Sequence, residues 1–242
     1  MKNIIASTRL YKNYQLAIPK AIRNKMEDLD IEDTVIDWYI NEDNDIVIRP
    51  RKKVCLEDVV GIIEDDDSRD AVELKRSLYK WKTQLNLKGA CTNEKHNWTK
   101  KEPVQMMILL DSSFLIAIFR KNDSLHQRAV ENIDVLKNDC CISNGILSEV
   151  ITVLAQKTKD IELVRLAYNY MKDNLTIIDE SNIEMYNDNV FAIFEKYNRE
   201  KFRLGFTDCS QVVIYEDCYL DYVVSFDEEF KRIEEIKLWE FK

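Results

Sequence analysis

The chain has 242 residues, of which 45% are hydrophobic and 33% charged, and its formal net charge at neutral pH is −9. This composition is that of a globular protein with a core, and its negative charge argues against a surface that grips nucleic acid everywhere, while leaving room for a local basic face. The sequence has no signal-peptide core and no apolar run of about 18 residues, so we expect a cytoplasmic protein with no membrane partner.

The first fifty residues predict a small β-rich unit with one basic face. Residues 1–25 carry six basic side chains and no acid. A short strand is expected to break at Pro19 into the start of a helix. Two further strands are expected at 34–40 and 46–49, with a turn between them and Pro50 closing the unit.

This stretch, through Gln15-Leu16-Ala17-Ile18-Pro19-Lys20-Ala21-Ile22-Arg23 and the hairpin that follows, resembles the AbrB/MazE-like looped-hairpin domain of antitoxins such as VapB over roughly residues 4–53. The resemblance implies an intertwined homodimer that binds operator DNA. A fold of this size also needs a partner to bury enough surface. Tyr14 stands where the family usually has glycine before Gln15. Carried over by position, the DNA-binding candidates are Arg9, Lys12, Lys20 and Arg23.

Residues 54–82 predict a helical tail that docks onto a partner surface. Apolar residues at helical spacing from Leu56 to Ile63 indicate a first helix, and a second is expected from a cap at Asp67 or Ser68 to about Lys82. Its thin apolar stripe of Leu74, Leu78 and Trp81 is typical of a helix that folds against a groove. Residues 83–105 are polar and predict a linker, which would average about 25–30 Å as a coil.

The second half of the chain predicts an α/β domain with acids at the ends of its strands. An apolar strand from Met106 ends on Asp111, and another from Tyr222 ends on Asp227. A helix opening at Asn144 carries Glu149 among apolar neighbours, and Thr207 is expected to cap a helix that places Asp208 at its positive end. The carboxyl ends of parallel strands share one edge of a sheet, where such folds place their ligands.

Residues 106–242 resemble the PIN domain, in particular the VapC-type toxin ribonucleases. The matching pieces are Leu110-Asp111-Ser112-Ser113-Phe114-Leu115-Ile116, Leu147-Ser148-Glu149-Val150, Thr207-Asp208 and Ser225-Phe226-Asp227-Glu228-Glu229-Phe230. The resemblance implies an α/β/α domain with a mainly parallel sheet. It also implies that four acids bind divalent metal and drive phosphodiester hydrolysis, with Ser113 and Ser225 as supporting hydroxyls; the acids are Asp111, Glu149, Asp208 and Asp227. The family often has threonine where this chain has Ser112 and Ser225.

The acids also predict a metal site on chemical grounds. Several carboxylates crowded together repel one another unless a cation lies between them. Mg²⁺ or Mn²⁺ prefers such oxygen ligands and activates water for attack on phosphate. The substrate groove would then draw its bases from Arg120, Lys121 and Lys201.

We therefore expect a fused antitoxin and toxin, in which a metal-dependent endoribonuclease acts on RNA and is inhibited by its own tail. Arg69 or Arg76 of the tail is expected to lie among the four acids. Met106-Met107 has the form of a second start within the chain. Two alternatives remain open at this point. One is a transcriptional regulator with a silent PIN domain, and the other is an RNA-processing nuclease whose first domain grips RNA.

Overall fold

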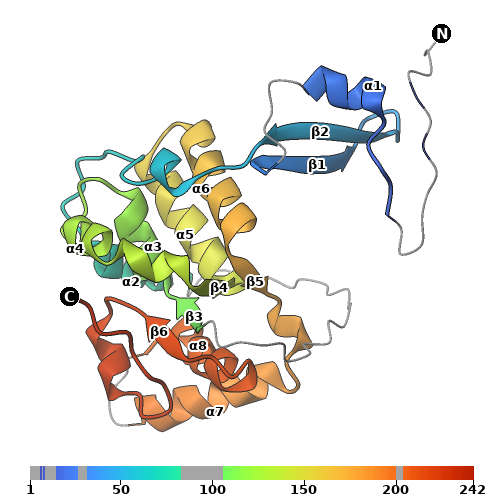
Figure 1. The fold of residues 1–242 in the computed structure, drawn as a ribbon. Helices are drawn as coiled ribbons and strands as arrows, with labels where there is room; N and C mark the ends of the chain where they lie inside the picture. Colours follow the sequence, from blue (N-terminus) through green and yellow to red (C-terminus); the bar gives the residue numbers. More distant parts are fainter. Residues whose placement is uncertain (1–5, 7, 9–14, 27–31, 83–105, 200–203) are drawn as a thin grey trace. The chain divides into compact units, whose positions relative to one another are not determined.

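The computed structural model describes residues 6, 8, 15–26, 32–82, 106–199 and 204–242 (Figure 1). The predicted linker at 83–105, as well as Arg9, Lys12 and Lys201, therefore lies outside the described residues. The chain divides into two compact units, Met1–Val54 and Cys55–Lys242. We call the first the hairpin unit and the second the α/β unit.

The hairpin unit contains two antiparallel strands, β1 (Thr34–Ile40) and β2 (Ile46–Lys52), preceded by the short helices α1 (Lys20–Arg23) and η2 (Asn24–Met26). The Asn41 side chain accepts hydrogen bonds from the backbone N–H groups of Asp43 and Asp45, which fixes the turn. Pro50 does not close the unit as predicted, because it lies inside β2 opposite Ile36. A two-stranded sheet has only edge strands, where proline is tolerated.

The α/β unit is built on a parallel sheet in the order β5-β4-β3-β6. Its strands are β3 (Met107–Leu110), β4 (Asp139–Ser143), β5 (Thr176–Ile178) and β6 (Tyr222–Val224). Leu109 at the centre pairs with Cys141 on one side and with Val223 on the other, and all three side chains are buried. The chain order reverses between β3 and β6, so this is the switch point at which open α/β sheets bind ligands.

Helices cover both faces of this sheet, with α3, α5 and α6 on one side and α7 and α8 on the other (Figure 1). The fold class predicted for the second half, an α/β/α domain with a mainly parallel sheet, is confirmed. The helices of this unit are α2 (Ala71–Lys82), α3 (Ser112–Phe119), α4 (His126–Glu131), α5 (Asn144–Lys157), α6 (Ile161–Asn174), α7 (Tyr186–Asn198) and α8 (Phe206–Asp217). The unit also contains the short 3₁₀ turns η3 (Leu56–Asp58), η4 (Ile133–Lys137), η5 (Glu180–Asn182) and η6 (Glu228–Arg232).

Residues 55–82, which we call the docked segment, pack onto the rest of the α/β unit. The prediction of a helix across Leu56–Ile63 is wrong, because only η3 forms and is followed by a turn at 59–61 and an isolated bridge at Ile63. The Ile63 N–H donates to the Phe119 carbonyl at 2.9 Å, and the Lys121 N–H donates back to the Ile63 carbonyl at 2.9 Å. These bonds satisfy the Phe119 carbonyl at the end of α3 and the Lys121 N–H that follows it, and the Ile63 side chain is completely buried.

The second helix of the docked segment forms, but later than predicted. Asp70 and Glu73 exchange side-chain-to-backbone hydrogen bonds in a capping box, so α2 begins at Ala71 and not after Asp67 or Ser68. Ala71, Leu74 and Leu78 are buried where α2 contacts α3 and α5. The side chain of Trp81 lies outside the described residues.

After β6 the chain covers the edge of the sheet. The short turn η6 follows Asp227. The Val223 N–H donates to the Lys237 carbonyl and the Trp239 N–H to the Val223 carbonyl, both at 2.9 Å. The C-terminal segment thus takes up the hydrogen-bonding groups that an edge strand would otherwise expose.

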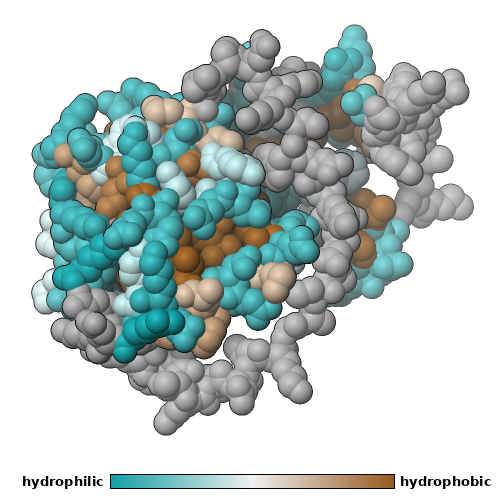
Figure 2. Space-filling view, turned by 90° about the horizontal axis from the view of Figure 1, so that it is seen from below, coloured by the Kyte–Doolittle hydropathy of each residue, from teal (hydrophilic) through white to brown (hydrophobic). Residues whose placement is uncertain are grey.

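The surface is mixed in polarity. Seen from below, apolar side chains are exposed at the centre of the face with hydrophilic ones around them (Figure 2). The exposed large apolar side chains of the α/β unit include Ile161, Met185, Phe191 and Phe206. None of the described helices has the length and apolarity needed to cross a bilayer.

We predict that Leu74→Ala loosens the docked segment. Leu74 is 2% exposed, and truncating such a side chain costs about 2–5 kcal/mol. Hydrogen exchange of the α2 amides measures the opening free energy directly. Ile161→Ala, at a side chain that is 62% exposed, is the control and should change stability by less than about 0.5 kcal/mol. Equal exchange in the two variants would show that α2 is not held by this contact.

Candidate active site

Asp111 lies at the carboxyl end of β3 and is the N-cap of α3. It is fully buried, and both of its carboxylate oxygens have partners. Oδ2 accepts hydrogen bonds from the hydroxyls of Ser113 at 2.6 Å and Ser225 at 2.8 Å. Oδ1 accepts from Lys75 Nζ and from Gln211 Nε2, each at 2.7 Å. The sequence Asp-Ser-Ser at a strand-to-helix turn therefore fixes the carboxylate from several sides.

Glu149 and Asp208 come from the first two turns of α5 and α8. Glu149 Oε2 accepts from the Ser112 hydroxyl at 2.8 Å, and its Oε1 is buried without a hydrogen-bond partner. Asp208 Oδ2 accepts from the Gly205 N–H at 2.8 Å. Gly205, and not Thr207 as predicted, is the N-cap of α8, so Asp208 lies in the third helical position. It remains in the first turn, where the helix dipole favours a carboxylate.

Asp227 is 4% exposed and caps η6 after β6. Its Oδ1 accepts from the Glu229 N–H at 3.0 Å and forms an ion pair with Arg76 Nη2 at 2.6 Å. The Asp227 N–H donates to the Ser225 hydroxyl, which in turn donates to Asp111. Ser225 thereby links the Asp111 carboxylate at the end of β3 to the backbone of Asp227 after β6.

We call Asp111, Glu149, Asp208 and Asp227 the acidic site, and the Lys75 ammonium lies among the first three of these carboxylates. Nζ is 2.7 Å from an oxygen of Asp111 and 2.7 Å from Oδ1 of Asp208. The contact to Asp208 is an ion pair without the geometry of a hydrogen bond. Lys75 is 1% exposed, and its ammonium also lies 5.3 Å from the centre of the Phe230 ring.

The charges of this cluster are strongly coupled. Burial alone would lower the pKa of Lys75, but the carboxylates around it hold that pKa well above its usual value. Burial would raise the pKa of Asp111, yet the Lys75 ammonium and the hydroxyl donors hold it at about 2. Burial raises the pKa of Glu149 to about 7, against the opposing effect of Lys75, and burial also raises the pKa of Asp208. Only part of the acidic charge is therefore neutralised by Lys75.

The donor chemistry of the acidic site fits Mg²⁺ or Mn²⁺, since all four side chains are carboxylates. The partnerless Oε1 of Glu149 supports this fit. Within the part of the chain that the structure describes, however, no three His, Cys, Asp or Glu side chains stand together as a metal site. Lys75 Nζ lies where a cation would touch Asp111 and Asp208, so a metal ion fits only once Lys75 has withdrawn.

The structure places the other predicted site residues unevenly. Ser113 and Arg76 lie at the acidic site, but Arg69 does not, because its guanidinium bonds Asp67. Of the bases expected in the substrate groove, Arg120 is fully buried and Lys121 is exposed. In the hairpin unit, Lys20 and Arg23 are exposed on α1.

Two polar residues of the site were missed in the sequence. Lys75 follows Ala71 by four positions and precedes Leu78 by three, so it lies on the buried face of α2. A charge on such a face requires a buried partner, and this was the available signal. Gln211 follows Asp208 by three positions on α8 and is fully buried, with Oε1 unpartnered.

We predict that the metal-free protein loses stability as pH rises from about 4.5 to about 7. The folded protein keeps a proton on Glu149 up to a pKa of about 7, whereas the unfolded chain releases it near 4.5. Stability is therefore full below the lower value and reduced by roughly 3 kcal/mol above the higher one. Urea unfolding in EDTA at several pH values measures this. Glu149→Gln should flatten the curve, and an unchanged slope would contradict the assignment.

Comparison with known proteins identifies the family. The family model described as PIN domain matches residues 108–236, more than half of the chain, and no curated protein matches. Similar solved structures include VapC20 of Mycobacterium tuberculosis, a sarcin-ricin loop cleaving toxin, at 17% identity over 52% of this chain and 93% of that one, with a TM-score of 0.45. VapBC2 from Rickettsia felis, bound to a promoter DNA fragment, has 19% identity over 56% and 100%, with a TM-score of 0.45. FitAcB from Neisseria gonorrhoeae has 16% identity over 55% and 97%, with a TM-score of 0.39.

The TM-scores of these structures are below 0.5, so no function is inferred from them. The family model covers more than half of the chain, and the chain belongs to the PIN-domain family.

Proposed function

We propose that the chain is a metal-dependent endoribonuclease of the VapC kind, fused to an antitoxin segment that keeps it inactive. The observation that carries this proposal is the position of the Lys75 ammonium, 2.7 Å from both Asp111 and Asp208 in the acidic site. PIN domains are generally nucleases that depend on divalent metal. In this chain the Lys75 ammonium, carried by helix α2 of the docked segment, lies where that cation would bind.

The acidic site supplies what phosphodiester hydrolysis needs. Asp111, Glu149, Asp208 and Asp227 would hold Mg²⁺ or Mn²⁺, which when bound lowers the pKa of a water and offsets charge on the phosphate. Ser113 and Ser225 orient Asp111 through their hydroxyls, and Gln211 holds its other oxygen. These donors keep Asp111 ionised and in place, so that the site is ordered before substrate arrives.

The docked segment would inhibit the nuclease by excluding the metal ion from the acidic site. A metal ion and an ammonium cannot both lie within bonding distance of the same Asp111 oxygen, because the two cations would repel strongly at such separations. Arg76 adds a second base by pairing with Asp227. Since the tail and the acids belong to one chain, tethering raises their effective concentration to about the millimolar range.

For the hairpin unit we propose operator-DNA binding as a homodimer. Lys20 and Arg23 supply exposed positive charge on α1, and Arg9 and Lys12 are further candidates from the sequence. Ile40 and Ile46 are 67% and 72% exposed, and Trp38 is 55% exposed. A two-stranded hairpin with such apolar exposure is expected to bury it against a second copy.

One observation favours a second candidate, a transcriptional regulator whose PIN domain is silent. Asp111 is fully buried, and Lys75 and Gln211 both bond the oxygen that would face a metal. If the docked segment never leaves, the α/β unit would serve assembly only. The two candidates differ in whether removing the inhibitory bases creates activity.

We predict that the full chain with Lys75→Ala and Arg76→Ala cleaves single-stranded RNA in Mg²⁺ at least about tenfold faster than the unmodified chain. The substitutions remove both bases from the acidic site and leave the four carboxylates in place. Cleavage is followed on labelled RNA by gel electrophoresis. Arg69→Ala is the matched control, because Arg69 lies on the same segment but bonds Asp67.

Adding Asp111→Asn to the activated variant should abolish cleavage, and so should EDTA. Activity that survives Asp111→Asn would point to a contaminating nuclease. No cleavage by the double variant in Mg²⁺ or Mn²⁺ would overturn the nuclease proposal and favour the silent regulator.

A further inference from the structure

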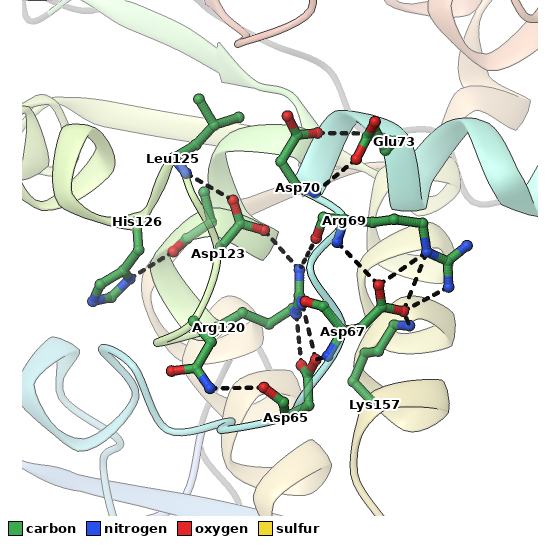
Figure 3. Close-up of polar contacts among 12 residues, drawn as sticks. Asp65, Asp67, Arg69, Asp70, Glu73, Arg120, Asp123, Leu125, His126 and Lys157 are labelled. Atoms are coloured by element: carbon green, nitrogen blue, oxygen red, sulfur yellow. Dashed lines mark hydrogen bonds and ion pairs between the residues drawn. The ribbon is translucent and has the colours of Figure 1, made fainter.

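The guanidinium of Arg120, the residue that ends α3, is completely buried under the docked segment (Figure 3). Nε and Nη2 form a fork on the Asp65 carboxylate, at 2.8 and 3.0 Å. Nη2 also donates to the Asp67 carbonyl and Nη1 to the Arg69 carbonyl, each at 3.0 Å. Only one bond, from Nη1 to Asp123 at 2.7 Å, goes to the PIN domain itself. Four of the five donor bonds of this arginine thus depend on the docked segment.

Lys157, at the end of α5, makes a similar contact. Its ammonium pairs with the carboxylate of Asp67, which also receives the Arg69 side chain (Figure 3). We call Arg120 and Lys157 the basic cluster. Two helices of the PIN domain therefore present a fork-shaped and a point-like cation side by side, and the docked segment supplies the anionic oxygens that meet them. Both cations are also the types that bind phosphate.

The basic cluster lies at a fixed distance from the acidic site. Asp111 and Arg120 cap the two ends of α3, and Glu149 and Lys157 lie eight positions apart on α5. At about 1.5 Å per residue both separations are about 12–14 Å, and α3 and α5 pack against each other. That distance corresponds to about four nucleotides of a stacked strand, at about 3.4 Å each.

We propose that Arg120 and Lys157 form a phosphate-binding subsite for the backbone of single-stranded RNA, and that Asp65 and Asp67 occupy it in place of phosphate. The proposal rests on the nuclease function proposed above and extends it. The docked segment then blocks the substrate at two points: Lys75 and Arg76 fill the acidic site, and the aspartates fill the basic cluster. It also explains how a chain with a formal net charge of −9 recruits a polyanion, since these bases become available only when the segment leaves.

A purely structural clamp is the alternative. In that case Arg120 and Lys157 would only hold the docked segment, and their loss would weaken docking without any effect on RNA affinity once the segment is released. The two readings therefore differ in what happens after the aspartates have been neutralised.

The test uses the full chain in EDTA, where no cleavage occurs, and measures fluorescence anisotropy of a labelled single-stranded oligoribonucleotide. Asp65→Asn with Asp67→Asn should tighten binding about tenfold, because it removes the negative charges that neutralise the basic cluster and weakens the hold of the segment on it. Asp66→Asn is the matched control, because Asp66 lies between them and is exposed, and it should leave affinity unchanged.

Adding Lys157→Gln to the double aspartate variant should reverse most of the gain. It should also lower the slope of log affinity against log salt by about 0.7, as expected for one lost phosphate contact on a single strand. Lys159→Gln, at an exposed lysine two positions away, should change neither quantity. Arg120→Lys, which keeps the charge but loses the fork, is a second variant and should weaken binding several-fold.

No gain from the aspartate substitutions, or equal effects of Lys157→Gln and Lys159→Gln, would overturn the subsite. Failure of the nuclease proposal is seen separately, as absence of cleavage by the variant with Lys75→Ala and Arg76→Ala in Mg²⁺. RNA binding that depends on Lys157 but is not followed by cleavage would support the subsite and overturn the nuclease.

Discussion

The burial of three carboxylates around one ammonium is the constraint on which the α/β unit depends. Asp111, Glu149 and Asp208 lie at the ends of elements that the parallel sheet brings to one edge, and their charges repel one another unless a cation lies between them. Lys75 supplies that cation from a segment that is distant in sequence. The packing of α2 on α3 and α5 is therefore tied to the electrostatics of the site as much as to apolar contact.

The docked segment is complementary in charge to the PIN domain at both of its ends. Acids of the segment meet Arg120 and Lys157 at one end of α3 and α5, and bases of the segment meet the acidic site at the other. Leu74 is buried next to the bases, and Ile63, which precedes the acids, is buried where its backbone pairs with the end of α3. Opposite charge at the two ends fixes the orientation of the segment, because the reverse orientation would place like charges together.

The positions of the four acids could be predicted from sequence because strand ends and first helical turns are local features. Asp111 and Asp227 follow short apolar runs, and the sheet order then brings them together. The role of Lys75 could not be predicted, since its partners come from elements 36 and more positions away. The irregular path of Leu56–Ile63 was also missed, because apolar residues at helical spacing suit any surface that covers them.

The helix N-caps also depend partly on local sequence and partly on tertiary contacts. Asp67, Ser68 and Asp70 are all suitable N-caps by residue type, and the choice of Asp70 follows from Asp67 being engaged by Arg69 and Lys157. Competition between a local and a tertiary use of one side chain is decided only in the folded protein. Thr207 and Gly205 present a similar choice on α8, and there the Asp208 carboxylate bonds the Gly205 amide.

The covalent connection between Lys75 and the acids that it meets has a consequence for control. Every copy of the chain that carries Lys75 also carries the four acids, so in that product the two are present in equal number at every level of expression. Changes in synthesis, dilution or selective turnover of a separate partner cannot alter that ratio. A signal that opens the acidic site of that product must therefore change its conformation or cut the chain, and not change how much of it the cell contains.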